Sequence, residues 1–151
     1  MLLSDIYKLF KTATGVSTDT RSVQQGELFF ALKGPNFNGN LYAQNALDKG
    51  AIAAVVDDAT IKGDRYIVVD DVLQTMQSLA TYHRRQFDIP VIVIGGSNGK
   101  TTTKELLHSV LSTKFKAYTT AGNLNNHIGV PLTLLRMPAE TEIAIIEIGA
   151  N

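Results

Sequence analysis

The chain has 151 residues, of which 44% are hydrophobic and 19% are charged, and it contains no cysteine. This composition predicts a globular protein with one large core or two small ones, and it excludes disulfides and thiolate metal sites. The 14 basic residues balance the 14 acidic ones. No overall field therefore favours nucleic acid or an anionic membrane, and any phosphate binding depends on local geometry.

The sequence offers no segment for membrane insertion or export. No apolar run approaches the roughly 20 residues that cross a bilayer. The N-terminus, with Asp5 between Leu3 and Ile6, lacks the basic and apolar pattern of a signal peptide. We therefore expect a cytoplasmic protein without membrane insertion.

The first half of the chain alternates between helical and extended patterns, which predicts an α/β fold. Ser4 can cap a first helix, whose apolar residues recur at helical spacing. The expected elements are a helix at 4–10, a strand at 27–32, a helix at 42–49, and strands at 51–56 and 66–69.

A loop rich in glycine and asparagine is expected at 33–40. Such residues tolerate positive φ, and the free N–H groups of the loop, together with Lys33, offer a site for an anion. From the residues alone, a plain connection between two elements is the better interpretation of this loop.

A longer helix is expected to follow the two aspartates at 70–71, which can cap it. Apolar residues and His83 recur along it on a single stripe, so His83 is interpreted as a packed or interface histidine rather than a ligand. The residue before a proline is disfavoured in a helix, and Pro90 therefore marks the end of this region. We place a domain boundary here, with a first domain at 1–88 and a second at 89–151.

Four β-branched residues at 91–94 predict a buried parallel strand, and the pattern at 101–111 predicts an amphipathic helix. Between them, glycines let the backbone approach an anion, successive N–H groups point at it, and Lys100 adds a full charge. Thr101 is placed to bring a hydroxyl to Mg²⁺. Ile94 replaces the first glycine of the general pattern, yet Lys100 and Thr101 favour an ATP site over an ordinary glycine-rich connection. The predicted nucleotide-binding residues are Gly96, Ser97, Asn98, Gly99, Lys100, Thr101 and Thr102.

A polar segment at 120–131 contains three asparagines and a histidine within five positions. Buried amides need hydrogen-bond partners, so the segment suggests a binding site, whereas a solvated loop needs no such explanation. Both interpretations stay open. Pro131 can then open a further helix.

An apolar strand at 143–147 ends in a carboxylate, Glu147. In a domain with a phosphate loop, a carboxylate at the carboxyl end of a strand emerges at the ligand crevice, where nucleotide hydrolases hold their metal. The alternative is that Glu147 caps the next element. The metal interpretation assigns Mg²⁺ to Thr101 and Glu147 and makes Lys100 and Glu147 the candidate catalytic residues.

Together, the segments at 96–105 and 122–135 resemble the Mur ligases of peptidoglycan synthesis. The N-terminal half is similar to the uridine-binding domain of that family, notably at 17–21 and 28–31, and the resemblance covers the whole chain. Its most specific part is the asparagine-rich segment at 123–135, which is similar to the members that add D-Ala-D-Ala.

The resemblance implies a small α/β N-terminal uridine-binding domain followed by the first part of a P-loop-type parallel-sheet ATP-binding domain. The implied reaction uses ATP to turn a carboxylate of UDP-MurNAc-tripeptide into an acyl phosphate, from which the amine of D-Ala-D-Ala displaces phosphate. Lys100 and the loop would hold the β- and γ-phosphates, and Thr101 and Glu147 would hold Mg²⁺. The implied substrate-binding residues are Thr20, Arg21, Lys33 and Gly34 at the UDP end, with Asn125, Asn126 and His127 near the nucleotide and the muramoyl group.

Two positions depart from the family pattern. Gly95 stands where the family usually has threonine, and 38–40 reads Asn-Gly-Asn where many members have Asp-Gly-His. The family also has three domains, so the resemblance implies an N-terminal piece that is inactive alone. The rival interpretations are a non-catalytic nucleotide or UDP-sugar binding module and the ligase that adds the third stem-peptide residue, and the asparagine-rich segment argues against the latter.

Overall fold

In the computed structural model, residues 2–149 are described, and the chain divides into two compact units, residues 1–79 and 80–151. Each unit contains a parallel β-sheet with helices, which confirms the predicted α/β class. The division falls within the helix α3 (Val72–Arg84). The domain boundary that the sequence suggests near Pro90 stays a prediction.

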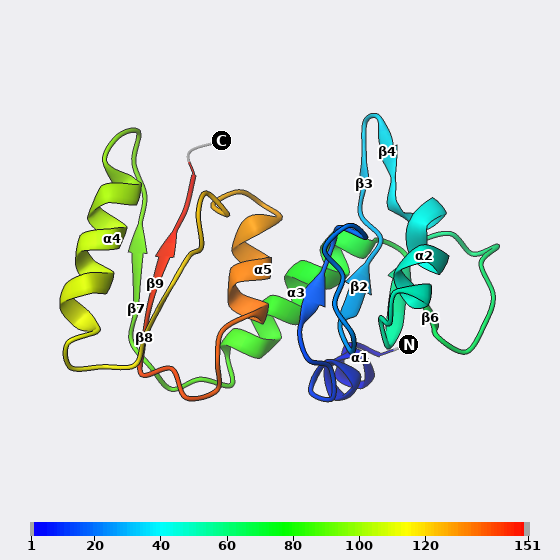
Figure 1. Ribbon diagram of the computed structural model, residues 1–151, viewed down its shortest axis with the longest axis horizontal. Helices are drawn as coiled ribbons and strands as arrows, with labels where there is room; N and C mark the ends of the chain where they lie inside the picture. The colour runs from blue at the N-terminus through cyan, green and yellow to red at the C-terminus, as the bar shows by residue number, and fades with distance from the viewer. Residues whose placement is uncertain (1, 150–151) are drawn as a thin grey trace. The chain divides into compact units, whose positions relative to one another are not determined.

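The first unit contains a four-stranded parallel sheet and a two-stranded antiparallel hairpin (Figure 1). The sheet has the order β1-β2-β5-β6. Its strands are β1 (Val16–Ser17), β2 (Leu28–Phe30), β5 (Ala53–Val56) and β6 (Tyr66–Val68), and the hairpin joins β3 (Lys33–Gly34) to β4 (Phe37–Asn38). The helices are α1 (Leu3–Phe10), the 3₁₀ helix η1 (Gly39–Tyr42), α2 (Ala43–Asp48) and the start of α3.

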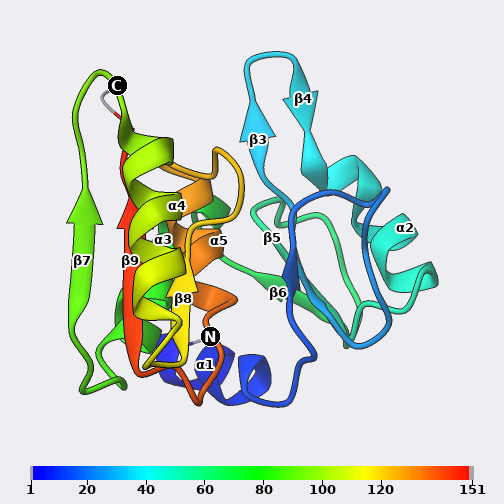
Figure 2. The ribbon, with the colours of Figure 1, turned by 60° about the vertical axis from the view of Figure 1, so that its left-hand side comes forward.

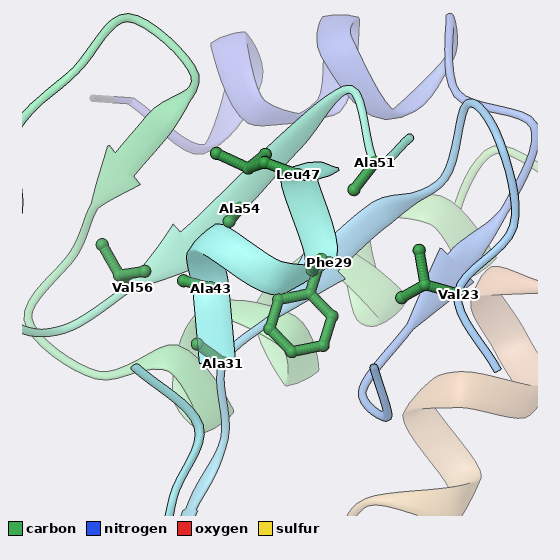
Figure 3. Packing of buried hydrophobic residues seen from close by; sticks show 9 residues of the cluster. Val23, Phe29, Ala31, Ala43, Leu47, Ala51, Ala54 and Val56 are labelled. Atoms are coloured by element: carbon green, nitrogen blue, oxygen red, sulfur yellow. The ribbon is translucent and has the colours of Figure 1, made fainter. Parts of the chain in front are cut away.

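The central strands β2 and β5 are buried along their whole length, as expected for a parallel sheet covered on both faces. Alternate residues of a strand point to opposite faces, so Phe29 and Ala54 join one cluster while Leu28 and Phe30 are buried on the other side. Small side chains in α2 and β5 let the helix lie close to the sheet. The cluster contains Val23, Phe29, Ala31, Ala43, Ala46, Leu47, Ala51, Ala54 and Val56 (Figure 3).

The first unit differs from the sequence expectation in three places. α1 begins at Leu3 without a side-chain cap, so the predicted capping by Ser4 is wrong; burial of Ile6 and Phe10 fixes the helix instead. The edge strand β1 has only two residues and lies in a polar segment without an apolar run, so the sequence did not predict it. The loop at 33–40 holds the hairpin β3–β4 and is therefore more than a plain connection.

The helix α3 matches its predicted cap and stripe. Asp71 Oδ1 accepts a hydrogen bond from the backbone N–H three residues later at 2.8 Å, and stripe residues such as Met76 and Leu79 are fully buried. His83 is 5% exposed, and its ring meets Phe87 edge-on with centroids 5.0 Å apart. His83 is therefore a packed histidine, as expected.

The second unit contains a three-stranded parallel sheet in the order β7-β9-β8. Figures 1 and 2 show the helices α4 and α5 on opposite faces of this sheet. α5 begins at Gly129, two residues earlier than expected. Pro131 therefore lies in the first turn of the helix, where its missing backbone N–H would have had no partner within the helix. The elements are β7 (Val91–Ile94), α4 (Lys100–Leu111), β8 (Ala117–Thr119), α5 (Gly129–Leu135) and β9 (Ile143–Glu147).

The strand β9, rather than β7, is the buried centre of this sheet. All five residues of β9 are buried, whereas Val93 of β7 is 57% exposed. The expectation that β7 is buried is wrong in the described structure, because β7 lies at a sheet edge and pairs with β9 alone. On α4, Leu106 and Val110 are mostly exposed, so the predicted apolar face is only partly covered.

Candidate functional site

The second unit builds a strand, loop and helix in the form that the sequence predicts. β7 ends at Ile94, and α4 begins at Lys100. Between them, Gly96 and Gly99 adopt φ of 126° and 76°, which residues with a side chain rarely adopt. Gly99 is the N-cap of α4 and offers no side chain to the first N–H groups of the helix. The positive end of the helix therefore faces the loop, as an anion site requires.

Lys100 folds back across this loop. Its ammonium donates a hydrogen bond to Gly96 O at 2.7 Å, which places a full positive charge beside the N-terminus of α4. Ser97, Asn98 and Thr102 are exposed on the same loop and first turn. The arrangement can bind an anionic group such as a phosphate through backbone N–H groups and one ammonium.

Glu147 lies at the base of the loop because β9 pairs with β7, where Glu147 is opposite Ile94. Its carboxylate is 1% exposed and has three neighbours, of which one comes from the asparagine-rich segment and two come from α4. Asn125 Nδ2 donates to Oε1 at 2.7 Å, and Thr101 Oγ1 donates to Oε2 at 3.2 Å. The ammonium of Lys104 lies 3.7 Å from Oε2.

These neighbours set the charge state of Glu147. Burial alone raises the pKa of the carboxyl, but the hydrogen bonds from Asn125 and Thr101 and the charges of Lys104 and Lys100 outweigh it. The pKa of Glu147 therefore lies below its ordinary value, and the group is a carboxylate at neutral pH.

Two residues of the asparagine-rich segment have different structural roles, one at Glu147 and one at the start of α5. Asn125 contacts Glu147, as described above, and so belongs to the site. Asn126 Oδ1 accepts hydrogen bonds from Ile128 N at 3.0 Å and Gly129 N at 2.8 Å, and thus caps the start of α5. His127 is exposed. Each of the two open interpretations, a site and a solvated loop, thus fits part of the segment.

Lys104 is the residue of this site that sequence reasoning missed. It is 0% exposed and donates to Thr120 O at 2.8 Å and Gly122 O at 3.1 Å. A signal was present, because Lys104 lies three residues before Leu107 and seven before Leu111, on the inward stripe of the helix. A lysine on such a stripe needs buried partners.

In the first unit, Thr20 and Arg21 line an open pocket of about 600 Å³, a size that suits a small ligand. The guanidinium of Arg21 binds Asp19 at 2.6 Å through Nη2 and lowers the pKa of that carboxyl to about 2. Phe37 and Tyr42 stack at 5.3 Å and are both partly exposed. From the sequence, only Thr20 and Arg21 were predicted for this pocket. Its lining residues are Thr18, Asp19, Thr20, Arg21, Phe29, Phe37 and Tyr42.

Lys33 and Gly34 form β3. The ammonium of Lys33 binds Asp57 Oδ1 at 2.7 Å, and Asn40, which is 5% exposed, donates to the same oxygen at 2.8 Å. Burial raises the pKa of Asp57, but Lys33 and Asn40 outweigh burial and the pKa is lowered overall. Asn40, one of the departures from the family pattern, therefore links the hairpin to the end of β5.

Two negative findings bound the chemistry of residues 2–149. This part of the chain contains no group of three or more histidine, cysteine, aspartate or glutamate residues that could hold a metal ion. Among the same residues, no helix is both long enough and apolar enough to cross a membrane. A cation at Thr101 and Glu147 therefore needs ligands in addition to the side chains that residues 2–149 bring together.

Comparison with known proteins identifies relatives. The chain is 45% identical over 141 residues to the UDP-N-acetylmuramoyl-tripeptide--D-alanyl-D-alanine ligase of Bacillus subtilis (strain 168), covering 91% of this chain and 31% of that protein. It is 41% identical over 140 residues to the enzyme of that name from Escherichia coli (strain K12), covering 93% and 31%. The chain thus spans about a third of the length of these relatives.

Solved structures agree with the sequence comparison. The MurF ligase from Thermotoga maritima in complex with ADP matches with a TM-score of 0.82 and 34% identity, over 94% of this chain and 33% of that one. Residues 94–151 match the Mur ligase middle domain. Residues 12–92, which are more than half of the chain, match the Mur ligase family, catalytic domain, and the chain therefore belongs to the Mur ligase family.

Proposed function

We propose that this chain supplies the UDP-sugar pocket and the phosphate loop of an ATP-dependent ligase that acts in the cytoplasm, where ATP is available. The proposed reaction joins D-Ala-D-Ala to UDP-MurNAc-tripeptide through an acyl phosphate. The observation that carries the proposal is the placement of Glu147 beside Thr101 at the base of the Gly96–Lys100 loop. Relatives that bear the name of this reaction support the choice of substrates.

The residues of the second unit suit ATP and Mg²⁺. A hydroxyl and a carboxylate are hard oxygen donors, and Mg²⁺ is commonly held by one or two such groups together with phosphates and water. We assign Thr101 and Glu147 to the cation, which would neutralise charge on the β- and γ-phosphates. We assign the γ-phosphate side to Lys100, whose ammonium would exchange Gly96 O for phosphate oxygens.

Asn125 has a positioning role in this proposal. Its side-chain amide donates a hydrogen bond to Glu147 Oε1 at 2.7 Å, and its backbone carbonyl accepts a hydrogen bond from the backbone N–H of Gly149. The carboxylate is thereby fixed before any ligand arrives, which lowers the reorganisation that phosphoryl transfer between two anions requires. We keep Asn126 and His127 as residues near the muramoyl substrate, with Asn126 acting through the α5 cap.

The first unit suits the UDP end of the substrate. A planar ring such as uracil can stack on the exposed Phe37–Tyr42 pair. Thr20 and Arg21 line the same pocket, and the charges of Arg21 and Lys33 suit a diphosphate that would compete with their present carboxylate partners. Gly34 leaves the hairpin backbone accessible, because no atom lies within 4 Å of the position that a Cβ atom would take there.

The test is a pair of NMR titrations of the 151-residue chain, one with ATP and Mg²⁺ and one with UDP-MurNAc. ATP should move the amide signals of Gly96, Lys100 and Thr101, and UDP-MurNAc those of Thr20 and Gly34. If neither ligand shifts its own set, the proposal is wrong. If both bind and a complete ligase carrying this chain releases no phosphate with all substrates, the non-catalytic binding module is the better description.

A further inference from the structure

Lys104 is a buried cation to which the proposed chemistry gives no task. It is the only residue of α4 that is fully buried in the described structure. Two carbonyl oxygens, Thr120 O at 2.8 Å and Gly122 O at 3.1 Å, fix its ammonium, and Glu105 Oε1 lies 3.1 Å away. Lysines are almost never fully buried without partners, and here these three oxygen atoms compensate for the burial of the ammonium.

The ammonium of Lys104 lies next to the carboxylate that we assign to a cation. The distance from Nζ to Glu147 Oε2 is 3.7 Å, and both side chains are at most 1% exposed. Charges that close, away from water, interact strongly. Lys104 therefore neutralises much of the negative charge that Glu147 would offer to a divalent cation.

The described residues compensate for that lost charge only weakly, because Glu105, which also pairs with Lys104 at 3.1 Å, has a side chain that is 60% exposed and screened by solvent. Residues 2–149 contain no group of three acidic, histidine or cysteine side chains around a common point, and Lys100 adds a second positive charge that acts on Glu147. Hard cations depend on the number of charged oxygen ligands for their affinity. A free divalent cation therefore meets a poor site at Thr101 and Glu147.

Lys104 cannot simply move aside when a cation approaches. Its position on α4 is fixed by the helix, and Thr120, which accepts its hydrogen bond, also accepts the backbone N–H of Glu147 through its hydroxyl at 2.9 Å. The lysine, the carboxylate and the Thr120–Gly122 turn form one connected unit. The positive charge therefore stays in place in every ligand state that keeps this network intact.

We propose that Lys104 is a positioning residue that makes cation binding at Thr101 and Glu147 depend on a bound nucleoside triphosphate. The ammonium holds Glu147 neutralised until phosphate oxygens at the loop supply the missing negative charge. Cation and nucleotide then bind together, and the cation alone does not occupy the site. This inference rests on the proposed assignment of ATP to the loop and of the cation to Thr101 and Glu147.

The test measures Mn²⁺, a paramagnetic stand-in for Mg²⁺, by the electron paramagnetic resonance signal of the free ion. Wild type, Lys104→Gln and the matched surface control Lys116→Gln are titrated with and without β,γ-methylene-ATP. Wild type and the control should bind Mn²⁺ weakly alone and at least about tenfold more tightly with the analogue. Lys104→Gln should bind Mn²⁺ alone at least about tenfold more tightly than wild type, because the site regains a full negative charge.

The outcomes separate this inference from the proposed function. If the analogue and Mn²⁺ bind together but Lys104→Gln gains no affinity for Mn²⁺ alone, the inference is wrong and the proposed function stands. If the analogue does not bind wild type at all, the proposed function fails and takes the inference with it. Lys104→Met replaces the glutamine variant if amide spectra show that the latter is unfolded. Tight binding of Mn²⁺ alone by wild type overturns the inference whatever the variants do.

Discussion

The two candidate ligand sites of this chain hold their charges in opposite ways. In the second unit, Glu147 is buried and its partners come from positions 22, 46 and 43 residues away, namely Asn125, Thr101 and Lys104. In the first unit, Arg21 pairs with Asp19, two residues away, and the guanidinium side chain is 88% exposed. The carboxylate of the second unit's site lies in the core, whereas the charged pair of the first unit's site lies on the surface.

This difference predicts how each site responds to change. A buried charge that loses a partner keeps its desolvation cost, so the nucleotide end should tolerate few substitutions and should be preorganised for its ligand. An exposed pair exchanges partners with little penalty, so the UDP end can release Arg21 to a diphosphate. The predictions below test this contrast, beginning with the largest expected effect.

The largest effect should follow Lys100→Ala in a complete ligase that carries this chain. Loss of one preorganised charge at a phosphoryl-transfer site typically lowers turnover by about 100-fold or more. The ammonium of Lys100 is the charge that lies across the loop here, at 2.7 Å from Gly96 O. Ligation rates of this variant and of Lys116→Ala, an exposed control, decide the matter. Turnover close to that of wild type in the Lys100 variant would contradict its assignment to the phosphates.

The next effect concerns the stability of the buried carboxylate. Asn125→Ala removes the 2.7 Å hydrogen bond to Glu147 Oε1 and leaves a buried charge with one donor fewer, which typically costs about 1–3 kcal/mol. Urea unfolding of the 151-residue chain, followed by amide signals of the second unit, measures the change. Asn123→Ala, at an exposed position of the same segment, should leave the unfolding midpoint unchanged, and equal midpoints for both variants would show that Asn125 has no such role.

The same contrast explains what could be predicted from the sequence. The strand, loop and helix around Lys100 were predictable, because glycines, a lysine and a threonine in that order need only local geometry. The stripe of α3 and its cap at Asp71 were predictable for the same reason. The identity of the family rested on such local motifs as well.

Other features depend on which elements become neighbours, and no local pattern reveals that. β7 reads as a buried strand, yet it lies at the edge of the described sheet, and β9 takes the centre. Lys104 could be recognised as inward-facing from its stripe, but its partners Thr120 and Gly122 become visible only when β8 is placed beside α4. The Phe37–Tyr42 stack likewise requires the turn through η1.

A smaller effect is expected for the half-buried pair of Lys33 and Asp57. The pKa of Asp57 is lowered from its ordinary 3.8, so the folded state binds this proton less readily than the unfolded state. Its contribution to stability is therefore present above pH 3.8 and is lost as the pH falls through the lower folded value. Asp57→Asn should destabilise the chain by up to about 1 kcal/mol at pH 7 and progressively less toward acid pH.

Urea unfolding at neutral and acid pH tests this, with Asp64→Asn as the control at an exposed carboxylate. The control should match wild type at both pH values. A difference between Asp57→Asn and wild type that stays constant as the pH falls would show that the ion pair does not account for the lowered pKa.

The smallest effect on stability should come from Arg21→Ala, although its effect on binding should be clear. Arg21 is fully accessible at the end of its side chain, and its pairing with Asp19 spans only two residues, so removing it breaks no long-range contact and thermal unfolding should not change measurably. The same variant should weaken binding of UDP-MurNAc, because the pocket loses its only lining cation among the described residues.

Arg85→Ala, on the segment that follows α3, provides a control for general loss of positive charge. Calorimetric titration of both variants with UDP-MurNAc separates the cases. Equal affinities of the Arg21 and Arg85 variants would place the diphosphate away from Arg21. A drop in thermal stability without a change in affinity would make Arg21 a structural residue, which its exposed position argues against.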